Sequence, residues 1–157
     1  MTSENGPVRV GVIGLGRGFV LMLPAFRNDD RVRLVAACAP REESRQAFVE
    51  EFGGKAYDDL EAFCADPDIE VIYVATPHQL HRDHVIAAAK AGKHVLVDKP
   101  LTITLEDGVQ MVEACQAVGV HLIVGPSHSF DAPVATARRL IESGDFGPVR
   151  MIHAFNY

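Results

Sequence analysis

Short apolar runs rich in β-branched residues alternate with segments of helical periodicity along most of the sequence. The expected strands cover residues 8–14, 32–38, 55–57, 69–76, 94–98 and 120–125. The expected helices cover residues 18–27, 41–52, 58–64, 80–91, 105–117 and 133–143. Strands joined by helices pair in parallel, because each helix carries the chain back across the sheet. The alternation therefore predicts an α/β fold with a doubly wound parallel sheet of six strands. Pro24 lies inside the first expected helix and should kink or shorten it.

A glycine turn follows the first expected strand. Gly14 would permit a tight turn at the end of the strand. Gly16, which follows Leu15, would let the backbone approach a pyrophosphate. Free N–H groups at the positive end of the next helix would then bind phosphate oxygens. Phe19 stands where a third small residue is expected, and Gly18 lies one place earlier. The turn predicts a dinucleotide site, with a plain structural turn as the alternative.

The end of the second expected strand bears on the choice of cofactor. NAD enzymes usually place an acid here to bind the ribose 2′-hydroxyl. This chain has Ala39 at that point, followed by Arg41, Ser44 and Arg45. A missing carboxylate beside Arg41 favours a 2′-phosphate, and hence NADP over NAD. The alternative is a solvated helix start with incidental charges.

Three histidines, His78, His81 and His84, follow the fourth expected strand at a spacing of three residues. Zinc ligands can have such a spacing. Asp83 would point to another side of the helix and does not complete a ligand set, so we expect no metal site. We expect this loop to meet the nicotinamide instead.

The fifth expected strand ends in Asp98, Lys99 and Pro100. A lysine at the carboxyl end of a central strand lies in the crevice where open α/β sheets bind ligands. There it can hydrogen-bond a substrate hydroxyl or relay its proton, and Pro100 would fix the turn after it. Lys99 is therefore the expected catalytic residue; the alternative is a surface lysine at a strand end. His128, just past the sixth strand, is expected to line the substrate pocket.

The expected cofactor-binding residues come from these four segments. They are Gly14, Leu15, Gly16, Arg17, Gly18, Phe19, Ala39, Arg41, Ala75, Thr76, Pro77, His78, His81, Asp98 and Lys99.

Residues 149–157 have the pattern of a further strand, for which a six-stranded doubly wound sheet has no place. We therefore expect a Rossmann-type NAD(P)-binding domain over residues 1–126. Residues 127–157 would be a connecting helix and the first strand of a truncated second domain.

Composition excludes several classes of partner. The formal net charge is −6 and no run of Lys and Arg is present, so a nucleic-acid partner is not expected. No apolar run approaches the roughly 18 residues of a membrane span, and the polar N-terminus is no secretory signal. Cys38, Cys64 and Cys115 are far apart in sequence, as in proteins of a reducing compartment. We expect a cytoplasmic protein with a small-molecule substrate.

Several motifs together resemble one family. The segments "ATPHQLH", "AGKHVLVDKP", "HLIVG" and "RRLIESGDFGPVR" resemble, in order and spacing, the N-terminal half of the glucose–fructose oxidoreductase / inositol dehydrogenase / rhizopine-catabolism (Gfo/Idh/MocA) family. The resemblance implies that Lys99 corresponds to the catalytic lysine of the family's Glu-Lys-Pro motif. The chain departs from the family at Asp98 for glutamate, at His78 for asparagine and at Ala39 for the usual acid. The last departure puts NAD preference in doubt.

The resemblance implies an NAD(P)-dependent oxidoreductase that transfers hydride between nicotinamide and a hydroxyl-bearing carbon. The substrate would be a sugar, a polyol or a cis-dihydrodiol. The segments "GLGRGFVLMLPAF" and "VGPSHSFDAP" most resemble the family's 4,5-dihydroxyphthalate dehydrogenases. The family resemblance also implies a homo-oligomer that is built through the second domain. Two alternatives are a non-catalytic NAD(P)-binding regulator, against which Lys99 argues, and a methyltransferase on a similar sheet, which the Asp98–Pro100 element fits poorly.

Overall fold

The computed structural model describes residues 6–125 and 131–153. The chain divides into two compact units, Met1–Gly125 and Pro126–Tyr157.

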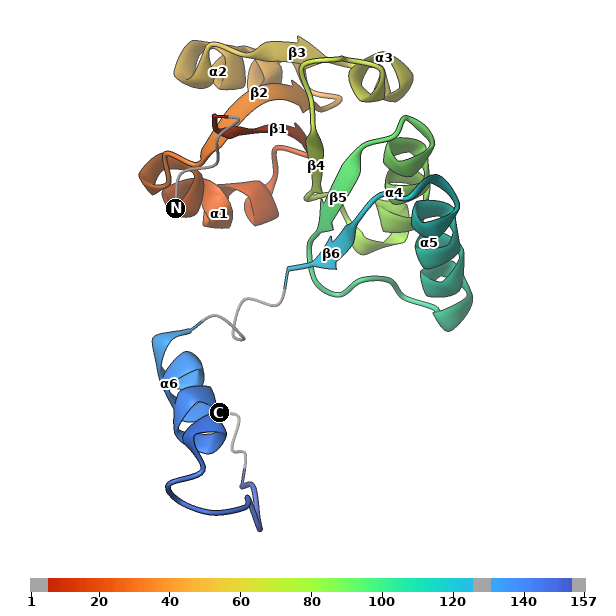
Figure 1. Ribbon diagram of the computed structural model, residues 1–157. Helices are drawn as coiled ribbons and strands as arrows, with labels where there is room; N and C mark the ends of the chain where they lie inside the picture. Colours follow the sequence, from red (N-terminus) through yellow and green to blue (C-terminus); the bar gives the residue numbers. More distant parts are fainter. Residues whose placement is uncertain (1–5, 126–130, 154–157) are drawn as a thin grey trace. The chain divides into compact units, whose positions relative to one another are not determined.

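The first unit is built on a six-stranded sheet in the order β3-β2-β1-β4-β5-β6, with parallel pairing throughout (Figure 1). The strands are β1 (Val8–Ile13), β2 (Val32–Cys38), β3 (Lys55–Tyr57), β4 (Val71–Val74), β5 (His94–Val97) and β6 (Leu122–Val124). The order reverses between β1 and β4, which is the arrangement of dinucleotide-binding sheets. The predicted fold class is confirmed.

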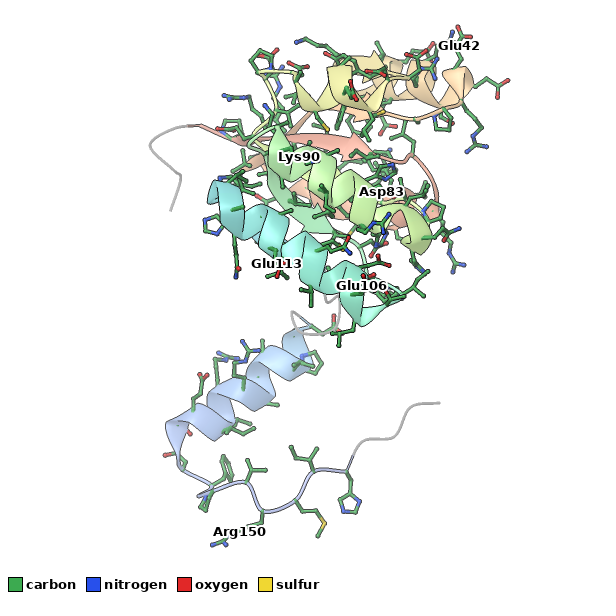
Figure 2. All side chains as sticks on the ribbon, turned by 90° about the vertical axis from the view of Figure 1, so that its right-hand side faces the viewer. Glu42, Asp83, Lys90, Glu106, Glu113 and Arg150 are labelled. Carbon is green, nitrogen blue, oxygen red and sulfur yellow. The ribbon has the colours of Figure 1, made fainter. Side chains whose placement is uncertain are left out.

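Helices cover both faces of this sheet. They are α1 (Arg17–Asn28), α2 (Glu42–Phe52), α3 (Leu60–Cys64), α4 (His81–Lys90) and α5 (Leu105–Val118), with a 3₁₀ turn η1 (His78–Leu80) before α4. In Figure 1, α1 and α2 lie against β1 to β3, and α4 and α5 lie side by side against β4 to β6. Exposed charged side chains cover the outward faces of α4 and α5, among them Asp83, Lys90, Glu106 and Glu113 (Figure 2).

Side chains of the central strands alternate between two buried clusters because successive residues of a strand point to opposite faces. On one face, Tyr73 of β4 packs with Phe19 of α1 and Phe48 of α2. On the other face, Ile72 and Val74 of β4 pack with residues of α3, α4 and α5. The sheet is thus buried on both faces at its centre, as the unbroken apolar run of β4 predicts.

Pro24 does not end the first helix. α1 continues past it to Asn28, so of the two expected effects, a kink or a shortening, the helix is not shortened. Proline removes the hydrogen bond to the carbonyl oxygen four residues earlier, which belongs to Val20. Val20 is 56% exposed, so this part of the helix lies at the surface of the protein.

The second unit contains α6 (Ala132–Ser143), which ends at Gly144 with φ 74°. The strand expected over residues 149–157 is wrong in its described part, because residues 149–153 form no strand. A strand requires a hydrogen-bonded neighbour, and the described part of this unit offers no other strand. Residues 154–157 lie outside the described residues. Within the two described stretches of the chain, no helix has the length and apolar character needed to cross a bilayer.

Candidate dinucleotide site

A cleft of about 480 Å³ opens at the carboxyl ends of β1, β2 and β4, where the strand order reverses. Its lining residues are Ile13, Gly14, Leu15, Gly16, Cys38, Ala39, Pro40, Arg41, Ser44, Asp58, Leu60, Ala75, Thr76, Pro77, Leu80 and His84. Ligands of open α/β sheets bind in this crevice. The structure therefore brings eight of the predicted cofactor residues into one cleft: Gly14, Leu15, Gly16, Ala39, Arg41, Ala75, Thr76 and Pro77.

Gly14 makes the tight turn that leads from β1 to α1. Its φ is 91°, and its N–H donates to the carbonyl oxygen of Cys38 at 2.9 Å. A Cβ at this position would lie 2.8 Å from Cγ2 of Thr76 and 2.9 Å from the carbonyl oxygen of Ala75. Both the backbone conformation and the close approach of β4 therefore require glycine.

Gly16 has a different role, because a Cβ there would meet nothing within 4 Å. The residue is the N-cap of α1, where no side chain caps the helix and no acidic residue lies in the first turn. The first N–H groups of the helix thus receive no hydrogen bond from an N-cap side chain, and they lie at the positive end of the helix dipole. This cradle fits the pyrophosphate of a dinucleotide, and protein packing alone does not explain the glycine.

Gly18 and Phe19 together replace the usual third glycine of the motif. A Cβ on Gly18 would lie 2.8 Å from Oδ2 of Asp98 and 3.6 Å from Cβ of Ala75, so α1 approaches the sheet closely at this residue. Phe19 is buried in an aromatic cluster, with ring centroids 6.3 Å from Phe48. Its ring does not line the cleft, and any contact with a cofactor would have to come from its backbone.

A pair of glycine substitutions separates the two requirements at Gly14. Gly14→Ala should lower the free energy of unfolding by about 2–5 kcal/mol, from strain at positive φ plus overpacking against β4. Gly53 has φ 67° and nothing within 4 Å of a Cβ, so Gly53→Ala should cost only about 1–2 kcal/mol. Urea unfolding of both variants checks this, and equal losses would mean that packing at Gly14 is unimportant.

The end of β2 supplies the groups expected around the adenosine ribose. Ala39 is buried, and Arg41 and Ser44 line the cleft. The Arg45 guanidinium is engaged elsewhere, since it donates to the carbonyl oxygen of Ala39 at 2.7 Å and to that of the next residue at 2.9 Å. Asp58, which sequence reasoning missed, lines the cleft from the end of β3 with a carboxylate oxygen 4.0 Å from Arg45. The sequence feature that could have identified Asp58 is its position directly after a strand of the same parallel sheet.

Helix α4 brings a second residue to the cleft that was not predicted from the sequence. His84 of α4 lies with Nδ1 3.0 Å from the Thr76 hydroxyl oxygen and lines the cleft. Burial lowers its pKa, so the ring is neutral near neutral pH and suited to a hydrogen bond with Thr76. His78 is exposed and does not line the cleft, while His81 is fully buried behind it. In the described stretches, no group of three or more His, Cys, Asp or Glu side chains could hold a metal ion.

Lys99 lies on the loop after β5, the neighbour of β4 in the sheet. Asp98 holds this loop at two points: its N–H donates to the carbonyl oxygen of Val74 at 3.0 Å, and its Oδ1 accepts from the Lys99 N–H at 2.8 Å. The Lys99 side chain is exposed and does not line the cleft itself. Arg17 is likewise exposed outside the cleft. His128 lies outside the described residues.

The Cys38 thiol at the cleft is no candidate nucleophile. Burial, with the Asp59 and Asp58 carboxylates nearby, raises its pKa to about 11. The thiol is therefore protonated near neutral pH, and the thiolate is the reactive form. The chemistry that the cleft supports is binding and orientation of a ligand, with Lys99 as the candidate proton carrier beside it.

A six-stranded parallel sheet with a glycine turn open at its switch point defines a dinucleotide-binding α/β domain. Residues 8–126 match the family model GFO_IDH_MocA, described as "Oxidoreductase family, NAD-binding Rossmann fold". The chain belongs to this family, and the resemblance seen in the sequence motifs is confirmed.

Relatives of this chain differ in their names and in the molecules crystallised with them. A 1-carboxy-3-chloro-3,4-dihydroxycyclohexa-1,5-diene dehydrogenase of Comamonas testosteroni is 50% identical over 151 residues, which are 96% of this chain and 38% of that protein. The WlbA dehydrogenase of Bordetella pertussis, crystallised with NADH and UDP-GlcNAcA, is 32% identical with a TM-score of 0.82, covering 94% of this chain and 42% of that one. Biliverdin reductase of Synechocystis sp. PCC 6803, crystallised with biliverdin and NADP⁺, is 31% identical with a TM-score of 0.73, covering 85% and 42%. The chain thus spans about two fifths of the length of these relatives.

Proposed function

We propose that this chain is the cofactor-binding part of an NAD(P)-dependent dehydrogenase that acts on a hydroxyl-bearing carbon. The observation that carries the proposal is the open cradle at Gly16, at the N-terminus of α1 and at the mouth of the cleft. Family membership and the cofactors crystallised with the two structural relatives support it.

Different residues along the cleft would bind different parts of the cofactor. The turn at Gly14 and Gly16 would hold the pyrophosphate, Arg41 and Ser44 the adenosine ribose, and Thr76 and Pro77 the part nearer the nicotinamide. The nicotinamide supplies hydride transfer when the cofactor is bound. Lys99 would donate a hydrogen bond to the substrate hydroxyl oxygen and receive or relay its proton. Asp98 would position Lys99 through the bond to its N–H.

We propose a carboxylated cis-dihydrodiol of a cyclohexadiene as the substrate. The name of the relative at 50% identity, together with the sequence resemblance to 4,5-dihydroxyphthalate dehydrogenases, supports this class. Oxidation of one carbinol carbon removes a hydride to NAD(P)⁺ and a proton from the hydroxyl, and the resulting ketone tautomerises to the catechol. Recognition of the carboxylate would fall to residues outside this chain. A homo-oligomer and a cytoplasmic location stay predictions from the sequence.

Titration of the chain with NADH and with NADPH, followed by nicotinamide fluorescence, tests the proposal. Arg41 makes no ion pair with a carboxylate among the described residues and lines the cleft, so it favours NADPH. We expect NADPH to bind more tightly, and Arg41→Ala to weaken NADPH by about 10–100-fold, as for a lost charge-assisted hydrogen bond. NADH affinity should change little. Failure of both nucleotides to bind would overturn the proposal. Tighter binding of NADH than of NADPH would reverse only the proposed preference for NADPH.

A further inference from the structure

His81 occupies an unusual position for a polar side chain. It is the first residue of α4, it is 0% exposed, and both of its ring nitrogens face backbone carbonyl oxygens. Nε2 lies 2.9 Å from the carbonyl oxygen of Thr76. Nδ1 lies 3.1 Å from that of Pro100 and 3.2 Å from that of Leu101. One side chain thus contacts two separate loops.

Carbonyl oxygens only accept hydrogen bonds, so each of these contacts requires an N–H on the ring. A neutral imidazole carries one N–H and can bond one loop, and the doubly protonated ring bonds both. Buried polar groups retain their bonds strongly, because an unsatisfied partner inside the protein is costly. His81 is therefore suited to hold backbone in place rather than to contact a ligand in the cleft.

The two loops are the two sides of the proposed reaction site. Thr76 lines the cleft, and Pro100 and Leu101 directly follow Lys99. The last backbone hydrogen bond between the ends of β4 and β5 runs from Asp98 to Val74. Beyond it, in the described part of the chain, the hydrogen bonds that join these loops pass through the His81 ring.

We propose that His81 is a positioning residue that holds the Lys99 loop through an N–H on Nδ1 and, in the doubly protonated ring, also holds the cleft wall at Thr76 through Nε2. The proposal rests on the proposed function for its catalytic consequence. It replaces the expectation that His81 contacts the cofactor. Its side chain would act through Lys99 on turnover and through Thr76 on cofactor binding.

Two conservative variants separate the two contacts. The amide nitrogen of asparagine can take the place of Nδ1, and that of glutamine the place of Nε2. His81→Asn should therefore retain the donor toward Pro100 and Leu101, and His81→Gln the donor toward Thr76. His81→Phe retains the ring shape without a donor. Val85, also fully buried in α4, contacts neither loop through a hydrogen bond, so Val85→Ala is the matched control for general loss of packing.

The link between the loops can be measured on this chain without activity. Backbone ¹⁵N relaxation should give order parameters of about 0.85 for the Lys99 and Leu101 amides in the parent chain, falling below about 0.6 in His81→Phe and His81→Gln. His81→Asn and Val85→Ala should keep the parent values. Order parameters that stay high in both His81→Phe and His81→Gln would overturn the link. If His81→Phe does not fold, the asparagine and glutamine pair decides the question.

The catalytic consequence is tested in the proposed dehydrogenase by combining His81→Gln with Lys99→Ala. We expect kcat to fall about 10–100-fold in His81→Gln alone, as for a misplaced catalytic group, with His81→Asn restoring most of it. In the Lys99→Ala background, His81→Gln should lower kcat less than about threefold, because residues that act as a unit are not additive. Equal losses in both backgrounds would refute action through Lys99 while leaving the proposed function intact. Normal turnover of Lys99→Ala alone would instead refute the role of Lys99, and the catalytic consequence with it.

Discussion

Lys99→Ala should lower kcat of the proposed dehydrogenase by about 10²–10⁴-fold, the usual contribution of one positioned general acid–base. The Kd for NADH or NADPH should change less than about threefold, because the Lys99 side chain does not line the cofactor cleft. Steady-state kinetics and fluorescence titration of the same preparation measure the two quantities.

Lys90 provides the matched control for this substitution. It is an exposed lysine in the last turn of α4, and Lys90→Ala removes the same charge without touching the β5 loop. Turnover of Lys90→Ala should equal that of the parent. Full activity of Lys99→Ala would contradict the assignment, and equal losses in the two variants would point to net charge rather than to a catalytic group.

Gly16→Val should weaken binding of both nucleotides by about 10–100-fold, since its side chain would occupy the space where the phosphate meets the helix N–H groups. A Cβ at this position meets no protein atom within 4 Å. The free energy of unfolding should therefore change by less than about 1 kcal/mol, within the range of ordinary surface substitutions that include capping effects. Fluorescence titration and urea unfolding give the two values.

Gly16→Ser sharpens this test, because serine is a favoured N-cap residue. Its hydroxyl can accept from the same N–H groups that would bind phosphate. We expect the serine variant to be at least as stable as the parent and still to bind NADH and NADPH more weakly. Retained affinity in both the valine and the serine variants would exclude the helix N-terminus as the phosphate site.

Periodicity in the sequence predicted the sheet and its flanking helices because strand and helix burial patterns differ in repeat length. It also led to the residues at strand ends, since the carboxyl ends of parallel strands meet at one edge. Ala39 and Arg41 reach the cleft for that reason. The directions of side chains on a helix start were not predictable in the same way. His81 and His84 are three residues apart on α4, yet His84 faces the cleft and His81 the β5 loop.

Two other features of the site were not predicted from the sequence, because they depend on tertiary packing. Asp58 reaches the cleft only because β3 pairs beside β2. The sequence spacing could not show why glycine stands at position 18 and not at position 19. The reason is the Asp98 side chain, which is eighty residues away in the chain and approaches Gly18 closely. Phe19 is accommodated because α2 supplies aromatic partners for its ring.

The approach of Gly18 to Asp98 means that the residue at one position limits the size of the residue at the other. The family's Glu-Lys-Pro motif has one more methylene in its acid than Asp98 has, and that methylene must be accommodated where α1 meets the β5 loop. The bond from the Lys99 N–H to Asp98 limits how far the carboxylate can withdraw. Positions 18 and 98 should therefore vary as a pair among relatives. Any redesign that changes the acid before the lysine should choose the residue at position 18 at the same time.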